Sequence, residues 1–124
     1  MSPAREIRLD SAAFLDSAEC RALELGEGAR TIVERYLACC YDELGKAPHL
    51  LEGEDMIELL EERLPAHFGK KDPLAEHAEA VLGAWLAFDN QRSVVLHLYE
   101  ISRALLEHAD DFRRVVESGA LAGR

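Results

Sequence analysis

Two amphipathic segments between Glu54 and Phe88 constrain the fold more than any other part of the sequence. In the first segment, apolar side chains return every three or four residues and charged side chains fill the remaining positions, which predicts a helix with one buried face. Proline lacks an amide hydrogen and disfavours helical geometry in the residue before it, so we expect this helix to end at Leu64, just before Pro65. The apolar positions are Met56, Ile57, Leu60 and Leu64.

The second segment begins at Asp72 and Pro73. An aspartate carboxylate can accept a free amide hydrogen of a first helical turn, and proline has the backbone geometry of the first helical position. An apolar stripe continues from there to Phe88 and contains Trp85, the only tryptophan of the chain. We therefore expect a second helix with Trp85 as the anchor of the core.

Apolar periodicity predicts further helices on both sides of these segments. The first begins at Asp10 or Ser11, and the pair Asp16-Ser17 leaves open whether this stretch is one helix or two. Gly45 is the expected end of the next stretch. The predicted helical stretches cover about residues 10–25, 29–44, 93–108 and 110–119.

Residues 94–99 are apolar on nearly all sides of the helix predicted there. Such a segment lies at the centre of a fold or in an interface between subunits. The β-branched Val94 and Val95 leave a strand as the alternative.

These patterns predict an all-α protein, a compact array or bundle of five to six helices. A chain of 124 residues is long enough to form one domain with its own core. We expect residues 1–9 to form an N-terminal arm and residues 120–124 to form a frayed tail.

The net charge of −10 arises because 24 acidic residues outnumber 14 lysines and arginines. Affinity for phosphates depends on clustered basic side chains, so this balance argues against nucleic acid and against anionic membrane surfaces as partners. The N-terminus lacks an apolar signal core, and no apolar run approaches the length of a membrane span. We therefore expect a cytoplasmic protein.

The three cysteines have no framework spacing, which predicts free thiols in a reducing compartment. Cys39 and Cys40 are adjacent on a predicted helix, a spacing that suits neither a disulfide nor a usual metal site. Cys40 falls on the apolar stripe and is expected in the core. Cys39 lies nearer the edge of that stripe and is expected to be the more reactive of the two.

The five histidines lack the spacings of helical metal sites. None follows a glutamate by three residues, as carboxylate-bridged metal bundles require, and no two lie four residues apart. His97 with Glu100, and His108 with Asp111, are pairs three residues apart that could each contribute ligands. No recognisable catalytic constellation is present either. The sequence therefore predicts no metal, no cofactor and no catalytic residues, and it favours a role other than that of an enzyme.

The most concentrated charge lies on the first amphipathic segment. Glu58 and Glu62 are one helical turn apart, and a basic partner surface would relieve their repulsion. The simpler interpretation is a helix face exposed to solvent, on which the first acidic side chains stabilise the positive N-terminal end of the helix. The candidate partner face consists of Glu54, Asp55, Glu58, Glu61 and Glu62.

A resemblance to known proteins is confined to residues 50–88. The residues that carry it are Glu54-Asp55, Leu60, Leu64-Pro65, Pro73 and Leu82, ahead of the helix that ends in an aromatic residue. This segment resembles a helical segment found in various uncharacterised bacterial proteins. The resemblance implies a bacterial source and an all-helical fold, and it carries no catalytic residues over to this chain.

Two hypotheses of function follow from these patterns. The first is a small cytoplasmic interaction or regulatory domain whose partner is a protein, either another chain or a second copy in a homodimer formed through Val94 to Leu106. The alternative is a ligand-binding or enzymatic helical bundle with a pocket near Trp85. The candidate pocket consists of Trp85, His97, Tyr99 and Glu100.

Overall fold

The computed structural model describes residues 3–123 of the 124-residue chain. Six α-helices dominate this part, and none of its residues lies in a strand. The prediction of a compact all-α array of five to six helices is confirmed. The α-helices are α1 (Ala4–Leu15), α2 (Ala18–Arg21), α3 (Glu27–Ala38), α4 (Gly53–Glu58), α5 (Ala78–Arg92) and α6 (Leu98–Ser118).

Shorter helical turns of two other kinds connect or extend these helices. Wide π-helical turns continue α3 and α4 without interruption, and tight 3₁₀ turns contain the three prolines that follow residue 45. The π-helical turns are η1 (Cys39–Leu44) and η3 (Leu59–Arg63). The 3₁₀ turns are η2 (Pro48–Leu50), η4 (Leu64–His67) and η5 (Pro73–His77).

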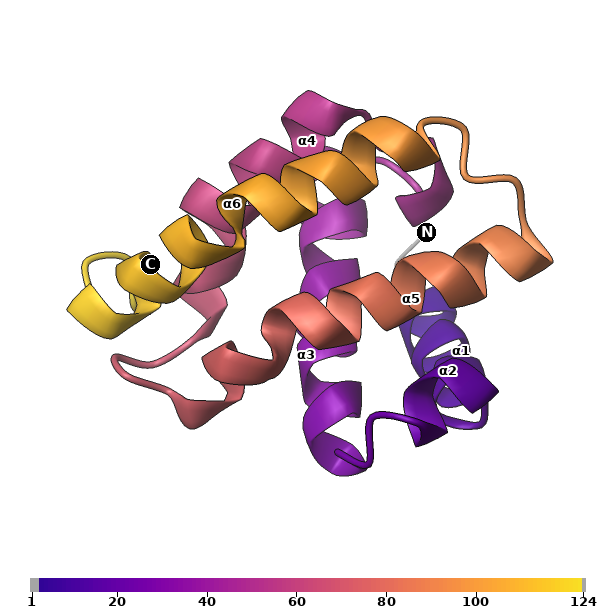
Figure 1. Cartoon of the computed structure of the whole chain (residues 1–124), viewed down its shortest axis with the longest axis horizontal. Coiled ribbons are helices and arrows are strands. Elements are labelled where there is room, and N and C mark those ends of the chain that lie inside the picture. Colours follow the sequence, from indigo (N-terminus) through magenta and orange to yellow (C-terminus); the bar gives the residue numbers. More distant parts are fainter. Residues whose placement is uncertain (1–2, 124) are drawn as a thin grey trace.

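The two longest helices, α5 and α6, run antiparallel along the long axis of the molecule and are joined by residues 93–97 (Figure 1). α5 crosses α3, and α4 with η3 packs along α6. α1 packs against α3, and α2 packs against α5. No helix within residues 3–123 is both long enough and apolar enough to cross a membrane.

Trp85 is fully buried, with 0% of its surface exposed, so its predicted place in the core is confirmed. Its ring lies 5.7 Å from that of Phe14 on α1 and 5.5 Å from that of Phe88 on α5, both measured between centroids. The Phe14 ring meets both aromatic neighbours edge-on, the arrangement that aromatic quadrupoles prefer. These contacts fix α5 against α1.

Several local signals act as the sequence predicts. The Asp72 carboxylate accepts the amide hydrogen of Leu74 at 3.0 Å and starts η5, which leads into α5. Gly45 has a left-handed φ of 66° and ends η1. The first predicted stretch is split in two, because Ser17 accepts the amide hydrogen of Cys20 at 3.1 Å and starts a separate helix.

The expectation of an N-terminal arm is wrong within the described residues, whereas the frayed tail stays a prediction. α1 begins at Ala4, so residues 4–9 are helical rather than an arm, and Ile7 packs against the core on the same side as Phe14. Residues 120–123 form turns, and the amide of Gly123 donates to the carbonyl of Ala66 at 3.2 Å. Residues 1, 2 and 124 of the predicted arm and tail lie outside the described part.

The predicted helix over residues 93–108 is also corrected. α5 continues past Phe88 to Arg92, and α6 begins only at Leu98. Ser93 has extended backbone, and the Val95 amide donates to the side chain of Asn90 at 3.3 Å. Residues 93–97 therefore form a connection and not the start of a helix. The apolar run over residues 94–99 is thus not a helix at the centre of the fold, which was one of the two alternatives that the sequence left open.

α6 continues through the predicted break at residues 110 and 111. Asp110 pairs with Arg113, and Asp111 pairs with Arg114. Pairs three residues apart lie on the same side of a helix and stabilise it. Two acids that favour a helix start in isolation are therefore accommodated inside a longer helix.

Replacing Trp85 by alanine (Trp85→Ala) should lower the free energy of unfolding by roughly 3–5 kcal/mol, because truncation leaves a cavity among packed aromatic rings. Urea denaturation followed by circular dichroism measures this loss. Tyr99→Ala removes a ring that is 73% exposed and is the matched control. It should change the free energy of unfolding by about 0.5 kcal/mol or less. Equal losses in the two variants would contradict the role of Trp85 as the core anchor.

Candidate functional site

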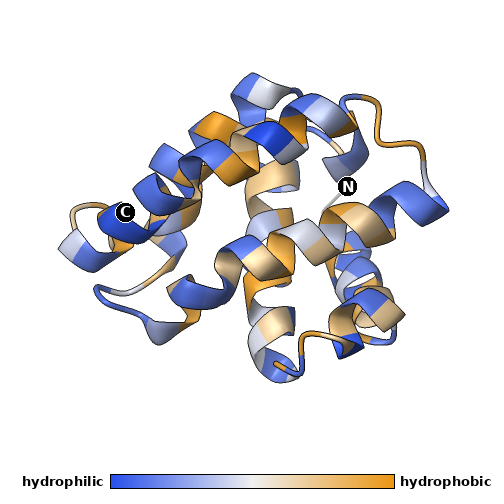
Figure 2. Cartoon of the chain, in the orientation of Figure 1, coloured by the Kyte–Doolittle hydropathy of each residue, from blue (hydrophilic) through white to orange (hydrophobic). Residues whose placement is uncertain are grey.

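The connection between α5 and α6 presents apolar side chains to solvent. Val94, Leu96, Tyr99 and Leu106 are 77%, 63%, 73% and 72% exposed, whereas Val95 is buried. Backbone hydrogen bonds hold Val95 in place, since its amide donates to the Asn90 side chain and its carbonyl accepts from Leu98, and its neighbours Val94 and Leu96 remain in solvent. Figure 2 shows this connection as an apolar stretch at the edge of the fold. We call Val94, Leu96, Tyr99 and Leu106 the apolar surface.

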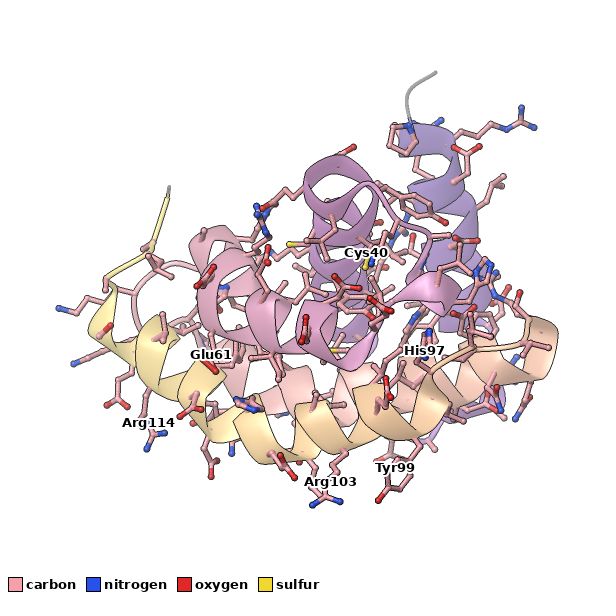
Figure 3. All side chains as sticks on the ribbon, turned by 90° about the horizontal axis from the view of Figure 1, so that it is seen from above. Cys40, Glu61, His97, Tyr99, Arg103 and Arg114 are labelled. Carbon is pink, nitrogen blue, oxygen red and sulfur yellow. The ribbon has the colours of Figure 1, made fainter. Side chains whose placement is uncertain are left out.

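Two of these side chains belong to α6 and lie on its outer side. Tyr99 and Leu106 are seven residues apart, which places them on one face of the helix, and Tyr99 projects away from the body of the protein in Figure 3. They line a shallow hollow of about 420 Å³ around the small side chain of Ser102. Leu50, which is also exposed, borders the other end of the surface, because His49 accepts the Leu96 amide hydrogen at 3.1 Å.

An apolar groove of about 440 Å³ runs beside Leu106 between α5 and α6. Gly83 and Ala87 supply its α5 side, and Leu98 and Leu106 supply its α6 side. A Cβ atom placed on Gly83 would meet no other atom within 4 Å, so the groove is open at that point. Leu106 therefore belongs both to the apolar surface and to this groove between α5 and α6.

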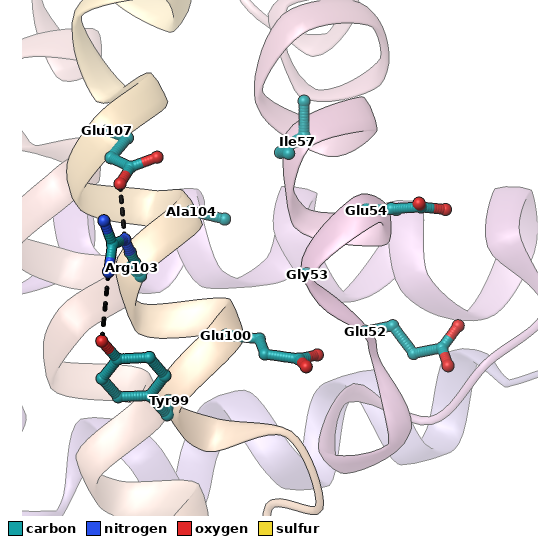
Figure 4. A pocket seen from close by; sticks show the side chains of 9 residues that line it. All are labelled: Glu52, Gly53, Glu54, Ile57, Tyr99, Glu100, Arg103, Ala104 and Glu107. Carbon is teal, nitrogen blue, oxygen red and sulfur yellow. Dashed lines mark hydrogen bonds and ion pairs between the residues drawn. The ribbon is translucent and has the colours of Figure 1, made fainter.

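A second groove, of about 500 Å³, separates α6 from the start of α4 and has an acidic lining (Figure 4). Its one cation, Arg103, donates to Glu107 at 2.7 Å and to the Tyr99 hydroxyl at 3.2 Å. The remaining charged lining residues are carboxylates, so this side of the apolar surface carries net negative charge. These carboxylates are Glu52, Glu54 and Glu100.

The four residues of the candidate pocket do not come together. Tyr99 and Glu100 line the acidic groove, and His97 lies beside it with Nδ1 3.6 Å from the Glu100 carboxylate. Trp85 is in the core and does not line this groove. Of the predicted pocket residues, only Tyr99 and Glu100 line the groove, and its opposite wall is α4, which the sequence did not locate.

The candidate partner face is likewise not one free acidic surface. Asp55 accepts from Lys46 at 2.7 Å and from the Glu52 amide at 2.8 Å, and it belongs to the helix cap. Partial burial opposes ionisation of Asp55, but these two donors outweigh it and lower its pKa. Glu58 pairs with Arg63, and Glu61 pairs with His108. Glu54 and Glu62 are exposed, and Glu54 lines the acidic groove.

A charge pair near Trp85, formed by buried Asp89 and exposed Arg92, was not predicted. Asp89 is only 2% exposed, and its Oδ1 accepts from Arg92 Nε at 3.3 Å. Arg92 also donates to Asp10 of α1 at 3.0 Å, and its guanidinium lies 4.8 Å from the centre of the Phe88 ring. Arg92 therefore ties the end of α5 to α1. Asp89 follows Trp85 by four residues on one helix face, and this spacing was the signal that could have placed it in the core.

Burial raises the pKa of Asp89, and the charge of Arg92 opposes that shift. Three buried polar atoms have no hydrogen-bond partner among residues 3–123, namely Asp89 Oδ2, the Tyr36 hydroxyl oxygen and Trp85 Nε1. Buried polar groups without partners destabilise a fold. Asp89 also lines a polar hollow of about 370 Å³ on the surface of the protein.

Asp89→Asn should stabilise the protein at neutral pH, and this gain should shrink as the pH falls. A buried carboxylate whose folded-state pKa is raised destabilises the fold above that pKa, and the effect disappears below the unfolded-state value of 3.8. Thermal unfolding of both proteins between about pH 7 and pH 4 measures the difference in melting temperature. A difference that stays constant or grows toward low pH would contradict the raised pKa of Asp89.

All three cysteines are free and buried, as the sequence predicted for Cys40. Cys39 is equally buried, which corrects the expectation of a more reactive thiol at the edge. A π-helical turn contains more residues than an α-helical turn, so adjacent side chains diverge less and both thiols face inward. Burial raises the pKa of Cys39, and the negative charge of Glu43 adds to this effect. The reactive thiolate is therefore disfavoured.

Two clusters among the described residues bring three potential metal-ligand atoms within 4.8 Å of one another. One joins the predicted pair His108 and Asp111 to Glu61, and His108 Nδ1 lies 2.9 Å from Glu61 Oε1. The other consists of Cys39, Glu43 and His67, which no sequence motif had indicated.

No protein-family model matches the sequence, and comparisons with curated proteins and with solved structures find no match. The resemblance of residues 50–88 to bacterial proteins therefore stays a prediction, as does the cytoplasmic location. Function has to be inferred from the geometry of the surface and of the side-chain clusters.

Proposed function

We propose that this protein is an interaction domain that binds another protein through its apolar surface. The observation that carries the proposal is the exposure of Val94, Leu96, Tyr99 and Leu106, each more than 60% exposed, within residues 94–106. Contiguous exposed apolar side chains on a folded domain mark interaction sites more often than isolated ones do. An exposed tyrosine beside a hollow is the kind of residue that dominates binding energy at protein interfaces.

The charge around the apolar surface selects the chemistry of the partner. The acidic groove beside Tyr99 contains Glu52, Glu54, Glu100 and Glu107, against which stand Arg103, paired with Glu107, and Lys46, whose Nζ lies 3.8 Å from Glu52. A second copy of this chain would place carboxylates against carboxylates, and each copy carries a net charge of −10. A partner with apolar side chains flanked by lysine or arginine complements both features. We therefore infer a basic amphipathic partner segment in preference to a homodimer.

A ligand-binding bundle is the less favoured function. The acidic groove is open along α6, and the aromatic anchor Trp85 is in the core and not in the groove lining. Binding sites for small molecules are concave and mostly apolar, with a few convergent polar groups. A groove lined by several carboxylates suits a long basic segment better than a small apolar metabolite.

Two synthetic helical peptides with the same leucine face test this proposal. One carries lysine at all other positions and the second carries glutamate, and isothermal titration calorimetry measures their binding to the full chain. The lysine peptide should bind, with an affinity that falls as salt rises, and the glutamate peptide should not. Leu106→Ser should weaken binding of the lysine peptide by about tenfold or more, because the variant lacks the apolar side chain that the peptide would cover in the complex.

Leu9→Ser is the matched control, since Leu9 is 58% exposed on α1 and lies outside the apolar surface. Its affinity for the lysine peptide should equal that of the wild type. Equal effects of Leu9→Ser and Leu106→Ser would show nonspecific electrostatic binding and would overturn the proposal. A concentration-dependent dimer in sedimentation velocity that Leu106→Ser abolishes would instead assign the apolar surface to a second copy.

A further inference from the structure

We propose that Cys39, Glu43 and His67 form a binding site for a thiophilic divalent cation, with zinc as the expected ion. The thiol, the carboxylate and the imidazole each place one ligand atom within 4.8 Å of the other two. This site is separate from the apolar surface and does not depend on the function proposed for it.

The backbone around this cluster is unusual. η1 supplies Cys39 and Glu43, η3 ends at Arg63, which contacts Glu43, and η4 follows directly with His67. π-helical turns are rare in globular proteins and recur at functional sites. The two π-helical turns of the described chain, which are far apart in sequence, therefore meet at one group of potential ligands.

The carboxylate of Glu43 lies at the centre of the cluster. Its Oε2 is 2.6 Å from His67 Nε2, and its Oε1 is 3.4 Å from Arg63 Nη1. In a tetrahedral zinc site the ligand atoms lie about 3.3–3.6 Å apart, given metal–ligand bonds of about 2.0–2.3 Å. The His67 and Glu43 atoms would separate by less than about 1 Å to admit the ion. The Cys39 sulfur, which lies within 4.8 Å of both, would approach them by no more than about 1.5 Å.

Arg63 does not prevent a cation from binding. Its guanidinium also pairs with Glu58, so its charge is compensated outside the cluster. A carboxylate can bind zinc through one oxygen while the other accepts from a neighbouring donor, and such outer contacts orient the ligand. Arg63 is therefore placed to hold Glu43 in position.

Solvent can reach the cluster from one side. Cys39 is fully buried, whereas the side chains of Glu43 and His67 are 29% and 33% exposed. An ion would enter between the two surface groups and bind the sulfur beneath them. A water molecule from the open side would complete four-coordination, as in zinc sites with three protein ligands.

The ligand atoms select zinc over harder cations. A thiolate sulfur with imidazole nitrogen suits zinc, whereas magnesium and calcium prefer oxygen ligands. When the ion binds, the Cys39 thiol releases its proton to solvent and a zinc–sulfur bond forms. His67 Nε2 gives up the hydrogen that it shares with Glu43, so that its lone pair binds zinc while Nδ1 carries the ring hydrogen. The thiolate and the Glu43 carboxylate then neutralise the dication. The second cluster, formed by Glu61, His108 and Asp111, has no sulfur, and Arg114 already pairs with Asp111.

Cobalt substitution tests the site directly, because a thiolate bound to Co²⁺ produces a charge-transfer absorption band in the near ultraviolet. The full chain, purified metal-free, is titrated with Co²⁺ alone and then with Zn²⁺. We expect one equivalent of Co²⁺ to produce the band and one equivalent of Zn²⁺ to remove it. Cys39→Ala should abolish the band. Cys40→Ala, which removes the adjacent and equally buried thiol, should keep it.

His67→Gln tests the site at a half-exposed position where the substitution leaves the core intact. Its affinity for Zn²⁺, measured by competition with a chromophoric chelator, should fall at least about tenfold, because a nitrogen ligand is lost. Absence of the band in the wild type, persistence of the band in Cys39→Ala, or unchanged Zn²⁺ affinity in His67→Gln would each overturn the proposal.

Discussion

The arrangement of the two long helices depends on the packing of Trp85 in the core. Its ring packs on Phe14 of α1, and Arg92, seven residues further along α5, reaches back to Asp10 of the same helix. These contacts fix the direction of α5 and the point at which it ends. The short connection to α6 then crosses the edge of the fold through residues 93–97, where Val95 is buried and the residues on either side are exposed.

The sequence predicts the helices well where local signals and core packing agree. Asp72 and Gly45 act as the cap and the stop that their chemistry indicates. The errors occur where a tertiary contact overrides a local signal. Asp89 is typical of a turn, yet its side chain is buried, and Arg92 at the end of α5 donates to Asp10 of α1. α5 therefore continues to Arg92, and α6 starts at residue 98 instead of residue 93.

Patterns along the chain locate only part of each site. Tyr99 and Glu100 are adjacent in sequence and do share a groove, but its other wall comes from α4, which periodicity cannot place opposite them. His67 and Glu43 are 24 residues apart and meet only because η3 and η4 return the chain to the end of α3.

One continuous helical stretch, from Gly53 to His67, connects the two proposed sites. Its first turn borders the acidic groove, its last residue is a proposed zinc ligand, and α4, η3 and η4 all contact α6. An ion shared by His67 and Cys39 would join the end of this stretch to the end of α3 and restrict its motion. Zinc would change binding at the apolar surface only to the extent that the partner prefers the restricted stretch, because coupling between sites requires a difference in affinity between two states.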